Sequence, residues 1–353
     1  MTATKNSVKI CLHFISQKFI WIIIASYIIA TVMPELGLKI RNFNFGNVNV
    51  LQSNLVISLP LLMLASLLFN AGLGVKAIEL KHLLLKPFLL ISGVLGNIVI
   101  PLTFIIVINL IMQFWHDQDE LQQILVGLAL VASMPIAGGS TAWVQNANGN
   151  LVLSLGLVLV STILSPLLTP LVLHAVGFVA TGDYAEDLHE LASNGAASFL
   201  GIWVILPSLL GILANWVVGD HRILAAMPYL KLINYAVLTL LIYSNASLTL
   251  PNAVFHPDID FLIIILVIVT LLCISTFASG YLLAHVFHAD RKETVSLVFG
   301  LGMNNTGTGL VIASLALADH TQVMLPIIFY NLIQYLMASV VYSRQRAKRK
   351  LNP

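Results

Sequence analysis

Apolar runs about 20 residues long follow one another along almost the whole sequence. A run of that length crosses roughly 30 Å of hydrocarbon as an α-helix, which satisfies its own backbone polar groups where water is absent. Ten such runs predict an all-α polytopic membrane protein whose main partner is the lipid bilayer. The predicted spans are residues 19–34, 51–75, 87–114, 121–147, 151–176, 194–218, 229–248, 259–284, 294–316 and 322–342.

The charged residues agree with this assignment and orient the chain. They make up only 9% of the sequence, whereas a soluble domain carries roughly a quarter. If the N-terminus is cytoplasmic, all of the 17 lysines and arginines except Lys39 and Arg41 fall on the cytoplasmic side, as the positive-inside rule requires. We therefore expect a multi-pass protein of a cell membrane, a bacterial inner membrane, with both termini cytoplasmic and with no nucleic-acid partner.

Two of the predicted spans are interrupted at equivalent places. Residues 133–143 read SMPIAGGSTAW, where Pro135 removes a backbone donor and the Gly138-Gly139 pair weakens the helix. Residues 300–310 read GLGMNNTGTGL. They lie in the fourth and ninth spans, and paired interruptions of this kind are typical of secondary transporters built from inverted repeats. The pattern predicts two inverted five-helix repeats in which helices 4 and 9 are broken and cross.

A helix that breaks in hydrocarbon exposes amide and carbonyl groups, each at a cost of several kilocalories unless a polar group faces it. Half-helix N-termini favour an anionic group, whereas unwound carbonyls and helix C-termini favour a cation. The glycines would let the backbone unwind, and the Asn and Thr side chains would line a polar site. For either patch alone, close helix packing through small residues is the alternative interpretation.

The interrupted segments also carry a family resemblance. Pro135 to Pro170, closing on STILSPLLTP, resembles the fourth and fifth helices of the bile acid:sodium symporter family and its bacterial homologues. GLGMNNTGTGL resembles the ninth helix, and LLMLASLLFNAGLGV and IIFYNLIQYLMAS extend the similarity. The resemblance implies a single transporter unit over residues 1–353. Its panel domain would cover about 19–75 and 194–248, and its core domain about 87–176 and 259–342.

The resemblance further implies that an organic anion binds in a cleft between panel and core, with two sodium ions behind the crossing helices. It implies no cofactor, and sodium is the one metal ion implied. The positions that match the family's cation site are Ser140, Thr141, Ser154, Gly300, Leu301, Met303, Asn304 and Thr306. The positions that would face the substrate are Gly138, Gly139, Asn305, Gln334 and Asn97.

Two departures from the family pattern bear on the coupling ion. Four residues after Ser154 the family has a threonine ligand and this chain has Val158, while Gly300 replaces a glutamate that bridges both sodium ions. None of the predicted spans holds a charged residue well inside it. Three mechanisms therefore stay open: sodium bound by neutral oxygens alone, an ion-independent facilitator, and proton coupling through His174.

The sequence thus predicts a secondary transporter that moves a small or amphipathic carboxylate by alternating access. An intramembrane enzyme is not expected, because the spans lack the carboxylates, Ser-His pair or metal cluster that hydrolysis there requires. A non-transport membrane receptor would have no need of interrupted helices.

Overall fold

The computed structural model describes residues 2–50, 53–75 and 87–351. The chain divides into two compact units. Unit 1 comprises residues 1–77 and 201–257, and unit 2 comprises residues 78–200 and 258–353. The predicted cytoplasmic lysines Lys76, Lys81 and Lys86 lie outside the described residues, as do residues 51–52 of the second predicted span.

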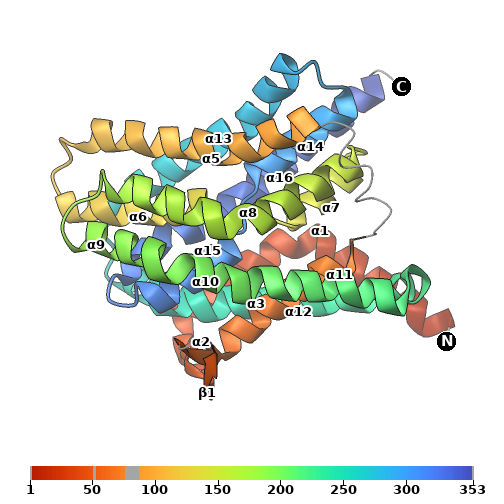
Figure 1. Ribbon diagram of the computed structural model, residues 1–353, viewed down its shortest axis with the longest axis horizontal. Coiled ribbons are helices and arrows are strands. Elements are labelled where there is room, and N and C mark those ends of the chain that lie inside the picture. Colours follow the sequence, from red (N-terminus) through yellow and green to blue (C-terminus); the bar gives the residue numbers. More distant parts are fainter. Residues whose placement is uncertain (1, 51–52, 76–86, 352–353) are drawn as a thin grey trace. The chain divides into compact units, whose positions relative to one another are not determined.

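Unit 1 is built around α12, against which α1, α2 and α3 pack, while α11 packs on α3 (Figure 1). The contact between α11 and α3 is close, since a Cβ at Gly72 or Gly211 would meet the backbone of the other helix. Its elements are α1 (Thr2–Val32), α2 (Pro34–Asn42), β1 (Asn44–Val50), β2 (Ser53–Ser58), α3 (Leu59–Leu73), η3 (Gly201–Ile205), α11 (Leu206–Val218) and α12 (Asp220–Phe255).

The first predicted span continues into a second helix through a bend. The α1 segment from Lys18 and α2 meet at 95°, and Tyr243 of α12 supports the bend. Its hydroxyl donates to the Met33 carbonyl at 2.6 Å and accepts from the Gly37 N–H at 3.1 Å. Gly37 is buried against Ser247, where a Cβ would collide with the serine side chain. The bend therefore depends on one phenol and on one position without a side chain.

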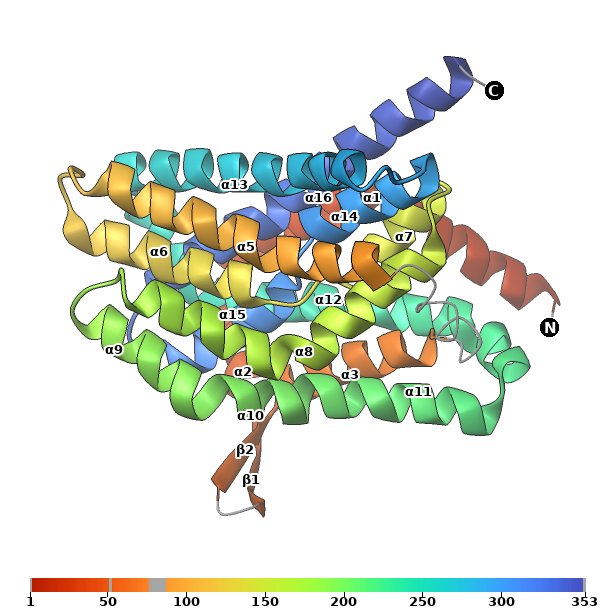
Figure 2. The same ribbon diagram turned by 45° about the horizontal axis from the view of Figure 1, so that its top comes forward.

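The prediction of a helix from residue 51 is wrong for the first part of that span. Residues 53–58 form β2, which pairs antiparallel with β1 through Val48 opposite Leu55 and Asn49 opposite Asn54. Figure 2 shows this hairpin next to α2 and α3. The alternation of polar and apolar residues over 47–50 is the period of a strand. The helix then begins at Leu59, since Pro60 fits the first turn of a helix but not its interior.

Unit 2 contains the two interrupted spans together with the helices around them. Helix α5 packs on α6, α8 and α13, and α13 also packs on α14 and α16. The elements are α5 (Pro87–Met112), α6 (Gln118–Ser133), α7 (Gly139–Asn146), α8 (Leu151–Gly177), α9 (Asp183–Glu190), η2 (Leu191–Gly195), α10 (Ala196–Leu200), α13 (Ile259–Val286), α14 (Arg291–Gly302), α15 (Thr306–Ala316), η4 (Thr321–Val323) and α16 (Met324–Leu351). Helix α9 lies in a connection that the sequence placed outside the membrane.

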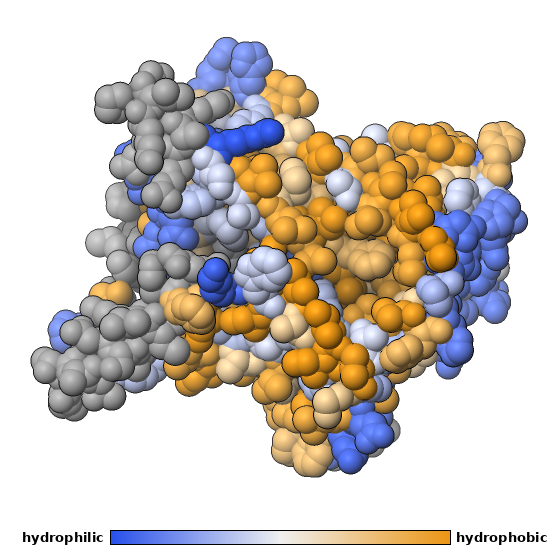
Figure 3. Space-filling model, turned by 180° about the vertical axis from the view of Figure 1, so that it is seen from behind, coloured by the Kyte–Doolittle hydropathy of each residue, from blue (hydrophilic) through white to orange (hydrophobic). Residues whose placement is uncertain are grey.

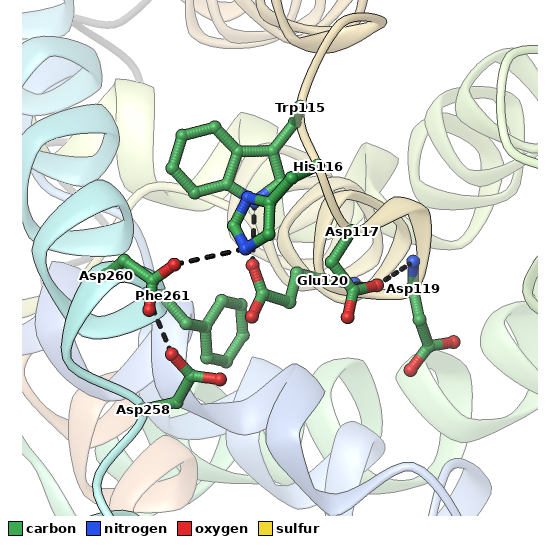
Figure 4. A network of polar contacts seen from close by, with 8 residues as sticks. All are labelled: Trp115, His116, Asp117, Asp119, Glu120, Asp258, Asp260 and Phe261. Carbon is green, nitrogen blue, oxygen red and sulfur yellow. Dashed lines mark hydrogen bonds and ion pairs between the residues drawn. The ribbon is translucent and has the colours of Figure 1, made fainter.

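A polar network ties the α5–α6 connection to the start of α13 (Figure 4). The Trp115 indole donates to Glu120 at 2.6 Å, and His116 Nε2 lies 3.1 Å from a carboxylate oxygen of Asp260. The carboxyls of Asp258 and Asp260 are joined by a further hydrogen bond. Because His116 and Asp260 are both more than half exposed, their ion pair adds little stability. The network mainly fixes where two helices begin.

The described residues contain six helices long and apolar enough to cross a membrane, and the bent α1–α2 pair would make a seventh. Helices α3 and α15 are apolar but shorter. One face of the molecule is covered largely by hydrophobic side chains (Figure 3), as lipid contact requires. The protein is therefore a helical multi-pass membrane protein, and the ten spans and the inverted repeat stay predictions.

Replacing Tyr243 by phenylalanine tests the bend between α1 and α2. We expect Tyr243→Phe to lower the free energy of unfolding by about 1–3 kcal/mol, because the Gly37 N–H and the Met33 carbonyl lose their side-chain partner. Thermal unfolding of the detergent-purified protein measures the change. Tyr229→Phe, on an exposed tyrosine of the same helix, is the matched control. An equal loss in both variants would contradict this role.

Candidate functional site

Both predicted helix interruptions are present in unit 2, and they meet. Helix α6 ends at Ser133 and α7 begins at Gly139, while α14 ends at Gly302 and α15 begins at Thr306. Ile136 and Asn304 form an antiparallel bridge between the two breaks. The paired segments, residues 134–138 and 303–305, are called the crossing from here on.

Backbone hydrogen bonds join the two sides of the crossing. The Ala137 N–H donates to the Met303 carbonyl at 2.8 Å, and the Asn305 N–H donates to the Pro135 carbonyl at 2.9 Å. Each break therefore supplies partners for backbone groups that the other break exposes. This pairing removes much of the cost of unwinding a helix inside a membrane.

Local sequence explains why the first break falls where it does. Met134, which precedes Pro135, is extended with φ −77° and ψ 145°, since a residue before proline avoids the helical region. The N–H of Ile136 then donates to the Ser161 hydroxyl of α8 at 3.1 Å. The Ser161 hydroxyl of the neighbouring helix thus accepts the hydrogen bond for which the interrupted helix provides no carbonyl.

The second break depends on residues on both of its sides. A Cβ at Gly302 would lie 2.6 Å from the ring of Phe277, so α14 ends where only glycine fits beside that ring. Met303 is extended, with φ −130° and ψ 110°. The Asn305 side chain accepts from the Thr308 N–H at 3.3 Å and caps α15, which satisfies one of the free N–H groups at its start.

The crossing brings together helix ends of both polarities. Helices α6 and α14 finish there, and the carbonyl end of a helix carries partial negative charge. Helices α7 and α15 begin there, and the amide end carries partial positive charge. One place in unit 2 therefore offers an electrostatic environment for a cation and, beside it, one for an anion.

Two asparagine side chains are anchored at the carbonyl end of α6. Nδ2 of Asn97 donates to the Met134 carbonyl at 3.5 Å, and Nδ2 of Asn304 donates to the Val131 carbonyl at 2.9 Å. Both residues are at least 97% buried, and the Oδ1 atom of each has no hydrogen-bond partner among the described residues. In each side chain the amide nitrogen donates to a carbonyl of the protein, while the amide oxygen is left without a donor among the described residues.

Two hydroxyl groups near the breaks share this property. Ser140 Oγ and Thr308 Oγ1 are fully buried and also lack a hydrogen-bond partner within the part of the chain that the structure describes. A buried polar atom left unpaired costs about 1–3 kcal/mol, and neutral oxygens are ligands that hard cations accept. The buried oxygen set, as we call it, consists of Asn97 Oδ1, Ser140 Oγ, Asn304 Oδ1 and Thr308 Oγ1.

The positions that depart from the family pattern are apolar in their surroundings. A Cβ at Gly300 would lie 3.0 Å from a methyl group of Leu157. Leu153, Leu157 and Leu301 belong to one buried hydrophobic cluster, and Val158 packs against it. Hydrocarbon therefore borders the place where a glutamate and a threonine would add oxygens.

Ser154 and Thr141, both cation candidates, are hydrogen-bonded to each other. The Ser154 hydroxyl donates to Thr141 Oγ1 at 3.1 Å. Ser154 is almost fully buried and Thr141 is half-buried. These hydroxyls link α7 to α8, unlike the buried oxygen set, whose members have no such partner.

The structure separates the residues that the resemblance assigned to the substrate. Gly138 and Gly139 are exposed and Asn305 is half-buried. A Cβ at Gly138 would meet nothing within 4 Å, and one at Gly139 would lie 3.9 Å from the Tyr335 hydroxyl. These residues form the accessible side of the crossing. Asn97 and Gln334 instead lie in its buried part, as do Gly300, Leu301, Met303 and Thr306.

Three side chains next to the crossing were not singled out as site residues from the sequence: Ser161, Thr308 and Asn331. Asn331 accepts from the Thr306 hydroxyl at 2.7 Å, and its spacing of three residues from Gln334 puts both on one face of α16. That spacing is a signal the sequence does carry. Thr308 lies inside the glycine-rich stretch itself, but nothing in that stretch distinguishes a bare hydroxyl from a bonded one.

His174, the residue considered for proton coupling, lies in the last turn of α8. It is twenty residues beyond Ser154, about 30 Å at the rise of an α-helix. Its Nδ1 lies 2.8 Å from Nδ1 of His189, a partner that the sequence analysis did not find. Among the described residues, no group of three or more His, Cys, Asp or Glu side chains could hold a metal ion.

Broken helices that meet inside a helical membrane protein are the arrangement of secondary transporters, and the comparisons agree with that class. A model of the sodium bile acid symporter family matches residues 61–254. The chain belongs to this family, and it is therefore a transporter, as the resemblance in helices 4, 5 and 9 predicted.

Two relatives from Bacillus subtilis (strain 168) are similar to the chain. YocS, named an uncharacterized sodium-dependent transporter, is 24% identical over 348 residues, which cover 96% of this chain and 94% of YocS. YbaS, named an uncharacterized protein, is 28% identical over 221 residues, covering 61% of this chain and 67% of YbaS.

Removing the Ser161 hydroxyl tests its support of the first break. We expect Ser161→Ala to destabilise the protein by about 1–3 kcal/mol, because the buried Ile136 N–H loses its acceptor. Ser165→Ala is the control, since Ser165 is buried on the same helix but bonds only the Thr162 carbonyl of that helix. Thermal unfolding in detergent compares the two variants. A larger loss for Ser165→Ala would refute the assignment.

Proposed function

We propose that the protein moves a small or amphipathic organic carboxylate across a cell membrane by alternating access, coupled to sodium. The observation that carries the proposal is the crossing, where paired helix breaks lie beside buried oxygens without partners. Unit 2 would act as the core domain and unit 1 as the panel domain. Both termini would be cytoplasmic.

The cation would bind to the buried oxygen set. Sodium is a hard cation that accepts carbonyl and hydroxyl oxygens of no formal charge, and it would satisfy atoms such as Asn97 Oδ1 and Asn304 Oδ1 that are otherwise left unpaired. The carbonyl end of α6, to which both asparagine amides are bonded, favours positive charge. The name of YocS, a sodium-dependent transporter, supports the same ion.

One sodium ion per cycle fits these residues better than two. The apolar surroundings of Gly300 and Val158 offer no oxygen to replace the family's glutamate and threonine. The hydroxyls of Ser154 and Thr141 are hydrogen-bonded to each other, which leaves each with less capacity to bind an ion. A site made of these residues would have no charged ligand and too few oxygen ligands, so the second sodium ion of the family would not bind.

The carboxylate would bind on the accessible side of the crossing. The amide ends of α7 and α15 favour a negative group there, and the exposed Gly138 and Gly139 leave room for it to approach the backbone. Asn305 would add a side-chain donor. Asn97 and Gln334 would not touch the substrate, because both are buried, Asn97 against the Met134 carbonyl and Gln334 against the Asn304 N–H.

An ion-independent facilitator of the same fold is the second candidate. The apolar packing at Gly300 and Val158 favours it, because the family's charged ligand is gone. The partnerless oxygens favour the sodium-coupled mechanism instead.

Uptake into proteoliposomes decides between the two mechanisms. We expect an inward sodium gradient to accelerate uptake of a labelled carboxylate relative to a choline buffer, with a Hill coefficient for sodium of about one because one ion binds per cycle. Equal rates in both buffers would remove sodium from the mechanism and leave the facilitator. A Hill coefficient near two would contradict the single site.

Filling the accessible side of the crossing tests the anion site separately. We expect Gly139→Leu to raise the substrate KM about tenfold, equivalent to about 1.4 kcal/mol of lost binding, while half-activation by sodium stays unchanged. Ala142→Leu, at an exposed position of the same helix, is the control. If the leucine at 139 left KM unaltered, the carboxylate would have to bind elsewhere.

A further inference from the structure

Helix α16 presents two buried amide side chains to the second break. Asn331 and Gln334 are 4% and 1% exposed and lie one turn apart on the same face of the helix. The Asn304 N–H donates to Gln334 Oε1 at 3.1 Å, and Gln334 Nε2 donates to Thr306 Oγ1 at 3.3 Å. Gln334 thus bonds residues on both sides of Asn305.

Thr306 completes the contact with α16. Its hydroxyl donates to Asn331 Oδ1 at 2.7 Å, and Gln334 Nε2 lies 3.4 Å from the same oxygen. The hydrogen bonds form a chain with one direction. The Asn304 N–H donates to Gln334, Gln334 donates to Thr306, and Thr306 donates to Asn331. A chain of buried hydrogen bonds that is satisfied throughout holds one conformation, whereas a chain missing a member leaves polar atoms unpaired.

This contact bears on the direction of the Asn304 side chain. Asn304 belongs to neither helix, so no helical hydrogen bond fixes its backbone. With its N–H held by Gln334, its Nδ2 reaches the Val131 carbonyl of α6 and its Oδ1 stays bare. A small rotation of this peptide would cost the bond to Val131 and move the oxygen.

We propose that Gln334 and Asn331 are positioning residues that hold the second break in the conformation presenting Asn304 Oδ1 to the coupled cation. The proposal rests on the proposed function for the identity of the ion. It assigns Gln334 a role other than the substrate contact that the resemblance implied. It also brings in Asn331, which the sequence analysis did not include.

The test uses the full-length protein with variants at both ends of the contact. Gln334→Leu removes its hydrogen bonds to Asn304, Thr306 and Asn331. Gln334→Glu keeps the size and an acceptor for the Asn304 N–H but has no donor for Thr306. Thr306→Val breaks the chain from the other side, and Thr306→Ser restores the hydroxyl. Gln345→Leu is the control, because Gln345 lies on the same helix and bonds the Tyr281 hydroxyl.

Two measurements are made on each variant. Hydrogen–deuterium exchange of the peptide covering residues 303–306 reports whether the break is held, and proteoliposome uptake gives the sodium concentration for half-activation and the substrate KM. We expect Gln334→Leu and Thr306→Val to raise both the exchange rate and the sodium constant by about tenfold or more, because each variant loses at least one buried hydrogen bond. The substrate KM at saturating sodium should change less than about twofold, and Thr306→Ser and Gln345→Leu should match the wild type.

Unchanged exchange in Gln334→Leu would overturn the positioning role. A raised substrate KM with an unchanged sodium constant would also overturn it and return Gln334 to the substrate site. Sodium-independent uptake by the wild type would defeat the proposed coupling and the link to a cation. The exchange rates would then decide, without reference to transport, whether α16 holds the break.

Discussion

The hydrogen bonds between the two helix breaks are the constraint on which the rest of unit 2 depends. A single break in a membrane helix would leave N–H and carbonyl groups unpaired, at several kilocalories per group. Here Ala137 bonds Met303 and Asn305 bonds Pro135, so each break stabilises the other. Neither interruption would persist alone, and their meeting places four helix ends side by side.

Side chains complete several backbone hydrogen bonds at the crossing. Ser161, Asn305 and Gln334 each accept a backbone N–H there. Among the described residues, the buried side-chain oxygens of Asn97 and Asn304 nevertheless have no hydrogen-bond partner. An orphaned buried oxygen is normally selected against, and the proposed cation would supply a partner for several of them in one region. That inference connects the packing of unit 2 to the proposed cation.

Apolar side chains surround the positions next to the crossing where the family pattern has a charged ligand. In place of a buried carboxylate, which would be costly without a permanent counter-ion, the chain has Gly300 against Leu157 and Val158 against the same leucine cluster. Glycine in place of a carboxylate removes a strong cation ligand and also the cost of burying its charge. It fits a transporter with fewer or weaker ion sites than the family pattern implies, built on the same broken helices.

The sequence by itself determined the membrane class, the two interruptions and the family, because each depends on local composition or on a contiguous motif. It misjudged residues 53–58, because SNLVIS runs directly into the apolar segment that follows and reads as part of the same helix. The tertiary structure alone decided which polar atoms of the crossing are bonded and which are bare. Asn331, Ser161 and His189 gain their roles from residues far away in sequence, as when Ser161 accepts from Ile136. Such pairings arise from the packing of whole helices, so no local pattern encodes them.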